Sequence, residues 1–228
     1  MSVASTARLV IDRRGVVTAL VTTAPAAGPE DQFRIATAVV DHWHRVGWPP
    51  GLVSVSCFCN IDGGSVLVYQ QWSDIEAAHQ ALRDPTGICR VPGVEAQPPV
   101  EYRLYRTVPG NGVSNPPPPV VCFPVAFFIV ESGESGRAKI DEMLAAEEAK
   151  AGTRREYPGG VAAHMHVSAD DRSVFVFSEW ASVEEHTAHL EDLWEDLLAE
   201  GGHRALEAGK PPTGDRYHHY ATKTAVHE

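Results

Sequence analysis

Histidines at two kinds of spacing are the residues of this chain best suited to move protons. His186 and His189 are three residues apart in a segment of helical pattern, so they lie on neighbouring faces of one helix. His164 and His166 alternate in a segment of strand pattern, so their side chains point to the same face of a sheet. An imidazole titrates near neutral pH and can serve first as a base and then as an acid. The pattern therefore indicates proton transfer in the later part of the chain.

Metal and nucleotide chemistry have weaker support in the sequence. No carboxylate or third histidine stands at a spacing that would complete a metal site with His164 and His166, so we expect no bound metal. The four cysteines include no Cys-x-x-Cys pair, and we expect them to be reduced thiols. The sequence also contains no Gly-rich phosphate loop and no dinucleotide fingerprint. We therefore expect no cofactor.

The charge balance excludes two classes of partner. The 228 residues include 19 lysines and arginines against 30 aspartates and glutamates, a formal net charge of −11 that repels nucleic acid and anionic membranes. The longest apolar stretch, residues 120–130, is too short to span a bilayer, and the amino terminus lacks the pattern of a signal peptide. We expect a cytoplasmic protein that acts on a small molecule.

An internal repeat organises the chain. When the sequence is aligned with itself at an offset of about 108 positions, Trp72 aligns with Trp180 and residues 51–62 align with residues 159–170. The turn aspartates and the polar residues beside them occur in both copies. Residues 110–119 between the two copies are rich in proline and glycine, as expected of a linker. We therefore predict two domains, residues 1–109 and 120–228, that arose by tandem duplication.

Each half shows the same order of predicted elements. A strand-length apolar run comes first, at 16–23 and again at 120–130, and a segment of helical periodicity follows it. A hairpin, a second helix capped by Ser73 or Ser182, and a last strand complete each half. The first helices are predicted at 29–45 and 137–155, and the last strands at 100–107 and 216–222. The order βαββαβ is that of the ferredoxin-like fold.

These residues resemble the antibiotic biosynthesis monooxygenase family of dimeric α+β barrels. The resemblance is carried by Pro50-Gly51, by Asp62-Gly63 before a strand, and by Val-Leu-Val-Tyr-Gln-Gln-Trp72 running into a helix, and it covers nearly the whole chain twice. It implies an α+β fold in which two tandem ferredoxin-like units pack their antiparallel sheets together as a barrel within one chain. An uncovered apolar sheet face is unfavourable in water, which supports the same pairing. The chain would act as a monomeric pseudo-dimer or form a homodimer.

The resemblance also implies an enzyme and a chemistry. Many oxygenases of this family use neither metal nor flavin: a phenol or anthrone is deprotonated in an apolar pocket, and its carbanion reduces molecular oxygen directly. The product is a quinone or a cleaved ring. The expected function is therefore a cofactor-independent monooxygenase for a polycyclic aromatic, polyketide-type intermediate in the biosynthesis of an antibiotic or a similar natural product.

The resemblance places a pocket tryptophan at the strand-to-helix junction. Because the first half carries Ser56 and Phe58 in place of the strand histidines, we expect the principal site in the later half. The predicted catalytic residues are His186, His189 and Trp180. Further substrate contacts are predicted from Trp72, His164, His166, Phe177 and Tyr217.

Three other functions stay open at this stage. A non-oxidative cyclase or isomerase of the same fold would use a histidine to move a proton in an aldol step. A binding protein would hold a reactive intermediate without converting it. Haem degradation is a further alternative, weakened because neither half carries the asparagine that this reaction leads one to expect on the first strand.

Overall fold

The computed structural model forms two compact units, and two of its strands have residues in both units. It describes residues 9–84, 86–93, 96–110, 114–130, 133–149, 156–199 and 213–225. Unit 1 comprises Met1–Leu104 together with Tyr217–Glu228, and unit 2 comprises Tyr105–Arg216. The carboxyl-terminal segment therefore returns to the first unit.

The predicted order βαββαβ is present in both halves of the chain. The first half contains β1 (Thr18–Pro25), α1 (Pro29–Arg45), β2 (Leu52–Asn60), β3 (Ser65–Trp72), α2 (Ile75–Arg83) and β4 (Val100–Pro109). The second half contains β5 (Phe123–Ile129), α3 (Gly136–Ala149), β6 (Gly160–Ser168), β7 (Ser173–Trp180), α4 (Val183–Ala199) and β8 (Thr213–Thr224). All described strand pairs are antiparallel, which makes this an α+β fold.

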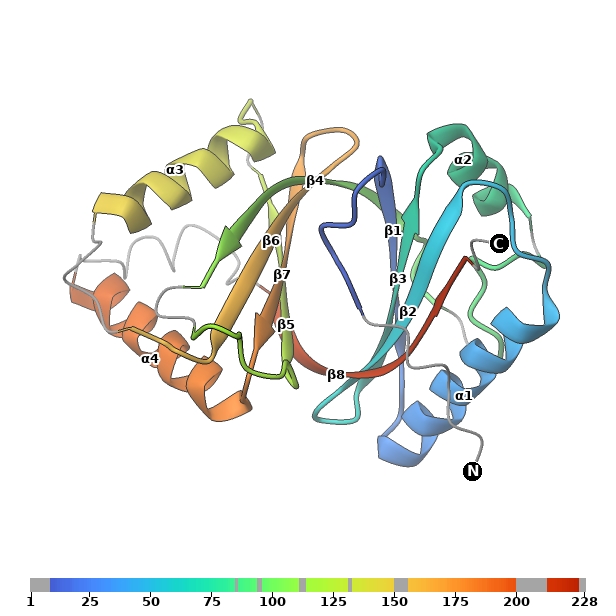
Figure 1. Cartoon of the computed structure of the whole chain (residues 1–228), viewed down its shortest axis with the longest axis horizontal. Coiled ribbons are helices and arrows are strands. Elements are labelled where there is room, and N and C mark those ends of the chain that lie inside the picture. The colour runs from blue at the N-terminus through green and yellow to red at the C-terminus, as the bar shows by residue number, and fades with distance from the viewer. Residues whose placement is uncertain are drawn as a thin grey trace. The chain divides into compact units, whose positions relative to one another are not determined.

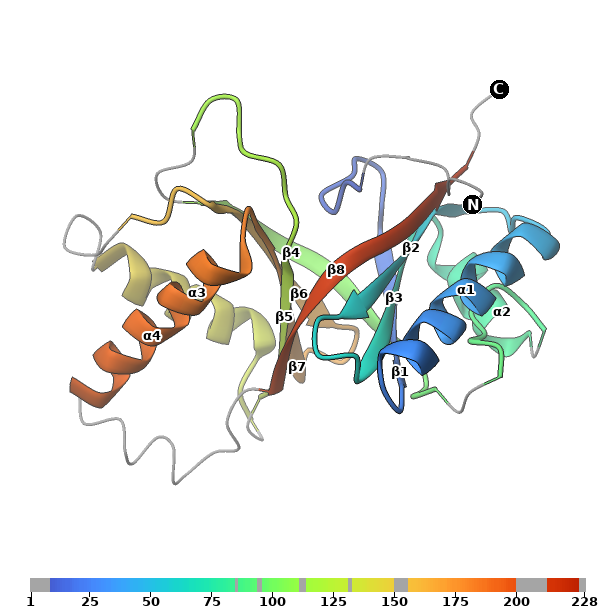
Figure 2. The same ribbon diagram turned by 90° about the horizontal axis from the view of Figure 1, so that it is seen from below.

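In unit 1 the strands lie in the order β4-β1-β3-β2-β8 (Figures 1 and 2). Helices α1 and α2 cover one face of this sheet, because alternate strand residues and both helices contribute to one apolar core. Val55, Val68 and Trp72 from the strands meet Ile35 of α1 and Ala78 of α2 there. All five of these side chains are buried.

In unit 2 the strand order is β8-β5-β7-β6-β4, and α3 packs on the sheet through Ile140. Met165, Val167 and Val174 form the apolar cluster beneath this helix. The residues between them in sequence therefore point to the opposite face of the sheet, because side chains alternate along a strand. That alternation decides where His164 and His166 lie.

Strands β4 and β8 each run from one unit into the other. The sequence predicted β8 as the closing strand of the second domain, yet it pairs with β2 along seven residue pairs, from Ser54 opposite Thr224 to Asn60 opposite Tyr217. The observed division consequently differs from the predicted boundaries at 109 and 120. Local periodicity shows that a strand exists, but it does not show which strand will be its partner. The packing of the two sheets as a barrel stays a prediction.

The residues that cap the amino-terminal ends of α2 and α4 can be compared with the predicted caps. Ser182 caps α4 as predicted, since its Oγ accepts a hydrogen bond from the Glu185 amide at 3.1 Å. The prediction of Ser73 for α2 was wrong: Asp74 is the cap and accepts from the Ala77 amide at 3.0 Å, while Ser73 donates to the Gly51 carbonyl. No helix among the described residues is long and apolar enough to cross a membrane.

Candidate functional site

Trp180 lies at the centre of an aromatic cluster in unit 2, at the end of β7. The rings of His186 and His189, both on α4, each lie 5.2 Å from the Trp180 ring, measured between ring centroids. Tyr157 completes the cluster, with its ring 4.9 Å from that of His189 and 6.1 Å from that of Trp180. The structure thus brings together the three residues predicted to be catalytic. Sequence reasoning missed Tyr157, which lies about twenty residues before Trp180 and carries no motif of its own.

Local sequence explains this arrangement. Trp180 ends its strand and Ser182 begins the helix, so only a two-residue turn separates the indole from the first turn of α4. Residues four and seven positions after Ser182 then lie on the side of α4 that faces the indole ring. His186 and His189 occupy those positions.

His186 is the most unusual titratable group of the cluster. Its side chain is buried, with 8% of the residue exposed, and its Nδ1 has no hydrogen-bond partner among the described residues. Burial, together with the smaller effects of the charges of His189 and Arg216, lowers the pKa of His186 to about 4. The imidazole is therefore neutral near pH 7 and has a buried polar atom available for a ligand. A buried nitrogen without a partner is costly and calls for an explanation.

The first half carries the same scaffold without the histidines. Helices α2 and α4 begin 108 positions apart, so Ala78 and Ala81 stand where the later half has His186 and His189. Both alanines are buried beside Trp72, and Trp72 itself is fully buried, with its Nε1 donating to Gln70 at 3.3 Å. Trp72 was predicted to contact substrate, and the structure places it in the core of unit 1.

His164, His166 and Phe177 lie on the other face of the unit 2 sheet, away from α3. His166 is fully buried, with its ring 5.2 Å from that of Phe175, which in turn lies 6.1 Å from the ring of Phe177. Burial, with a smaller effect of the neighbouring His164, lowers the pKa of His166 to about 3. The two strand histidines share a face, as predicted. They are nevertheless separated from the Trp180 cluster by the thickness of the sheet.

His164 has two polar neighbours that sequence reasoning missed. The Thr107 hydroxyl lies 3.1 Å from its Nδ1, and a carboxylate oxygen of Glu179 lies 3.5 Å from its Nε2. The geometry of the second contact is too poor for a hydrogen bond, and Nε2 has no other partner among the described residues. The repeat held a signal for this pair, since the matching residues of the first half are the uncharged Ser56 and Gln71.

Tyr217 lies in unit 1, within a layer of buried polar side chains on the face of the sheet away from α1 and α2. Its hydroxyl lies 2.9 Å from the Ser65 hydroxyl, and Tyr217 is 1% exposed. Two further contacts belong to the same layer: Ser54 donates to Gln71 at 2.6 Å, and Ser56 lies 2.8 Å from Thr222. The structure therefore does not bring Tyr217 to the Trp180 cluster.

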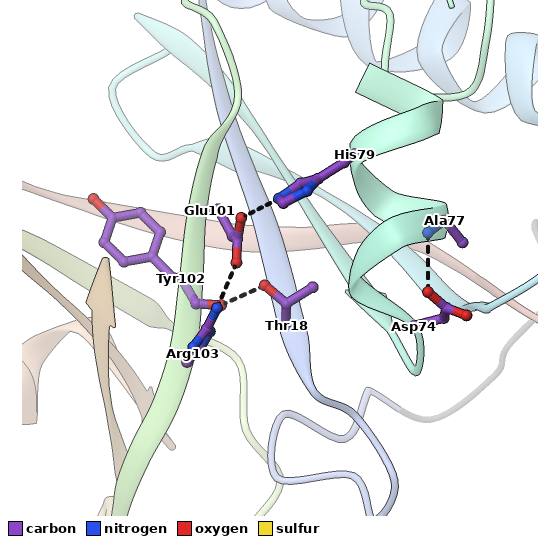
Figure 3. A network of polar contacts seen from close by, with 7 residues as sticks. All are labelled: Thr18, Asp74, Ala77, His79, Glu101, Tyr102 and Arg103. Carbon is purple, nitrogen blue, oxygen red and sulfur yellow. Dashed lines mark hydrogen bonds and ion pairs between the residues drawn. The ribbon is translucent and has the colours of Figure 1, made fainter. Parts of the chain in front are cut away.

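His79 is the histidine on α2, the helix of the first half that matches α4, and it has a structural explanation. Its Nε2 lies 2.6 Å from Glu101, which also contacts Arg103 at 3.4 Å, so that the pair joins α2 to β4 (Figure 3). The His79 side chain is 38% exposed. An ion pair at this degree of exposure contributes little to stability and provides no dry environment for catalysis.

Two of the thiols, Cys59 and Cys89, lie in unit 1, and a groove in unit 2 lies apart from the Trp180 cluster. Burial raises the pKa of Cys59 and of Cys89 to about 11, which leaves both thiols protonated and unreactive. No group of three or more metal-ligating side chains occurs in the described part of the chain. A groove of about 290 Å³ lies between the end of β4 and α3, lined by Arg106, Thr107, Val108, Pro109, Leu144 and Glu148. It includes none of the predicted site residues.

Comparison with known proteins supports the fold. No protein-family model matches the sequence. No curated protein matches it either. Among solved structures, an anthrone oxidase-like protein matches with a TM-score of 0.64 at 14% identity, over 92% of this chain and 94% of that chain. A protein provisionally named a monooxygenase from Fusobacterium nucleatum gives 0.55 at 9% identity, over 92% and 95% of the two chains. Another from Lactobacillus acidophilus gives 0.51 at 8% identity, over 91% and 96%. At these identities, the likeness is one of fold.

Proposed function

We propose that this protein is a cofactor-independent oxygenase that oxidises a polycyclic aromatic, polyketide-type intermediate in natural-product biosynthesis. The observation that carries the proposal is His186, a neutral and buried imidazole that has an unpartnered Nδ1 and whose ring contacts that of Trp180. The fold shared with an anthrone oxidase-like protein and with proteins named as monooxygenases adds support. In this proposal the later half carries the principal site.

The reaction of an anthrone shows what the site must do. A base removes a proton from the central CH₂ carbon, and the resulting carbanion passes one electron to oxygen. The radical pair combines into a carbon-bound peroxide. Loss of the remaining proton on that carbon, with cleavage of the O–O bond, gives the quinone carbonyl and one molecule of water. Anthrone plus O₂ thus becomes anthraquinone plus H₂O, and no other reductant is required.

In this proposal, each step of the reaction is assisted by a side chain in or beside the Trp180 cluster. Nδ1 of His186 accepts the first proton, and the imidazolium then returns a proton to the departing oxygen. The faces of Trp180 and Tyr157 provide flat apolar surface for an aromatic substrate. Arg216, whose charge acts on His186 and whose guanidinium donates to Thr187 at 2.8 Å, stabilises the developing carbanion.

The proposal extends to the state of the protein in the cell. We propose that one chain, which holds both units, works as a monomeric pseudo-dimer in the cytoplasm without bound metal or organic cofactor. Light scattering of the purified protein tests the oligomeric state. A mass of two chains at micromolar concentration would contradict the monomer.

Oxygen uptake with 1,8-dihydroxyanthrone as the substrate tests the function. The wild-type protein should consume oxygen and form 1,8-dihydroxyanthraquinone, whereas His186→Ala should be slower by about a hundredfold to ten-thousandfold, the usual contribution of a positioned base. His79→Ala is the matched control, because it removes a histidine from the equivalent helix outside the proposed site, and its rate should stay within a factor of two of wild type.

Two outcomes would overturn the assignment. Equal losses in His186→Ala and His79→Ala would show that the later half does not carry the site. Conversion of a polyketide-like substrate without oxygen uptake would favour the cyclase alternative, and tight binding of the anthrone without turnover would favour a carrier.

A further inference from the structure

A hydrogen bond between Tyr157 and Asp192 links the segment before β6 to α4. The Tyr157 hydroxyl donates to the Asp192 carboxylate, and both side chains are half-buried. Asp192 lies three residues, about one turn, after His189 on the helix. The ring of Tyr157 also contacts the rings of His189 and Trp180. The bond therefore joins the Trp180 cluster to the part of α4 just beyond its histidines.

The sheet fixes the indole of the cluster, whereas a helix carries the two histidines. Trp180 ends β7, and its ring packs so closely against Gly160 of β6 that a Cβ there would lie 3.3 Å from two indole atoms. His186 and His189 lie on α4. The position of the imidazoles relative to the indole is therefore set by the contacts that hold this helix in place.

Polar contacts between described residues hold α4 at three points. Just before its start, the Ala181 amide donates to the Gly159 carbonyl at 2.7 Å. In its second turn, the Thr187 hydroxyl accepts from Arg216 of β8 at 2.8 Å. Asp192 lies five residues beyond Thr187, past both histidines. Because the first two contacts lie near one end of the helix, the bond to Asp192 is the one that fixes its tilt over the indole.

The first half of the chain carries neither the histidines nor the tyrosine. Pro49 stands at the position of Tyr157, and a proline has no hydroxyl to donate. Asp84, which matches Asp192, instead accepts from the amide and the hydroxyl of Thr86 at 2.8 and 2.9 Å. The bond thus occurs in the half whose second helix carries the two histidines.

We propose that Tyr157 and Asp192 are positioning residues of the oxygenase site, and that their hydrogen bond holds α4 so that His186 stays buried against Trp180. The inference rests on the proposed function where it concerns turnover, but the burial of His186 is measurable without turnover. Loss of the bond lets α4 tilt away from the sheet, which admits water to the imidazole and displaces it from the indole.

An NMR titration of His186 tests the positioning role. In protein with ¹⁵N-labelled histidine, the imidazole signals that disappear in His186→Ala belong to this residue. Tyr157→Phe removes only the hydroxyl and should raise the pKa of His186 from about 4 to about 5 or above, because hydration favours the charged imidazole. Asp192→Ala should also raise it. Loss of a negative charge would by itself lower this pKa, so a rise reports hydration. His189 and Arg216, whose charges act on His186, are unchanged in both variants.

Two matched variants separate the lost hydrogen bond from a general disturbance. Asp192→Asn keeps an oxygen that accepts from the tyrosine, so it should retain a pKa of His186 close to that of wild type. Tyr105→Phe breaks a second tyrosine–aspartate bond of unit 2, in which the Tyr105 hydroxyl donates to Asp141 of α3 at 2.8 Å. It should leave the pKa of His186 unchanged.

Oxygen uptake with 1,8-dihydroxyanthrone at about pH 7 tests the consequence for turnover. Tyr157→Phe retains the apolar ring, so KM should stay within about twofold of wild type. Its kcat should fall about tenfold to hundredfold, because a displaced base transfers protons less efficiently.

The two measurements distinguish failure of this inference from failure of the proposed function. An unchanged pKa of His186 in Tyr157→Phe, or equal effects of Asp192→Asn and Asp192→Ala, would overturn the positioning role. Absence of oxygen uptake by the wild-type protein would overturn the oxygenase assignment, and the NMR titration would still decide whether the bond keeps His186 buried.

Discussion

The burial of His186 makes a sharp prediction about how stability depends on pH. Its pKa is about 4 in the fold and 6.5 for an ordinary histidine, so the folded state binds fewer protons than the unfolded chain between these values. The contribution of this group to stability is therefore fully present above pH 6.5 and is lost as the pH falls toward 4. His186→Ala, which installs the residue found at the matching Ala78, removes this dependence.

The magnitude follows from the two pKa values. Between about pH 7 and about pH 5, protonation of the unfolded chain at this one group lowers the free energy of unfolding by about 2 kcal/mol. His186→Ala also loses packing against Trp180, but that loss does not depend on pH. Urea unfolding of both proteins at the two pH values separates the effects: the variant should gain about 2 kcal/mol relative to wild type at the lower pH.

Leu190→Ala on the same helix is the control, because Leu190 is 47% exposed and does not titrate. Its offset from wild type should be the same at both pH values. If His186→Ala behaved like this control, the imidazole would titrate in the fold as it does in the unfolded chain. His186 would then not lie in a dry site, and the argument for it as the catalytic base would fail.

Three further predictions concern the scaffold and the cofactor. Trp72→Ala should lower the free energy of unfolding in urea by about 3–5 kcal/mol, because Trp72 is fully buried in the core of unit 1. Dialysis against a chelator should leave oxygen uptake unchanged, and loss of activity that one added metal restores would instead make His164 and His166 candidate ligands. A fragment of residues 1–109 should aggregate or self-associate in size-exclusion chromatography, because it lacks the segment of β8 that pairs with β2; a stable monomer would contradict this.

Features that depend on near neighbours in sequence were predictable. The bounds of α1 agree with the predicted 29–45, and the two hairpins fall where Asp62-Gly63 and Asp170-Asp171 allow tight turns. The contact of Trp180 with His186 and His189 also follows from spacing, since a strand end, a short turn and one helix face determine it. Helical and strand periodicity are encoded locally, so a sequence can be read for them directly.

Contacts between residues far apart in the chain were decided only by the tertiary structure. The strand pairing places Tyr217 beside Ser65 in unit 1 rather than beside Trp180, and it brings Thr107 to His164. Neither contact has a local signal, because the pairing of a strand depends on the whole set of strands that compete for it. The pKa of His186 likewise depends on burial and on Arg216, thirty residues away. The sequence by itself therefore determined the helices and strands and three of the four residues of the Trp180 cluster. The fold determined which sheet face each predicted residue occupies and whether its charged form can be solvated.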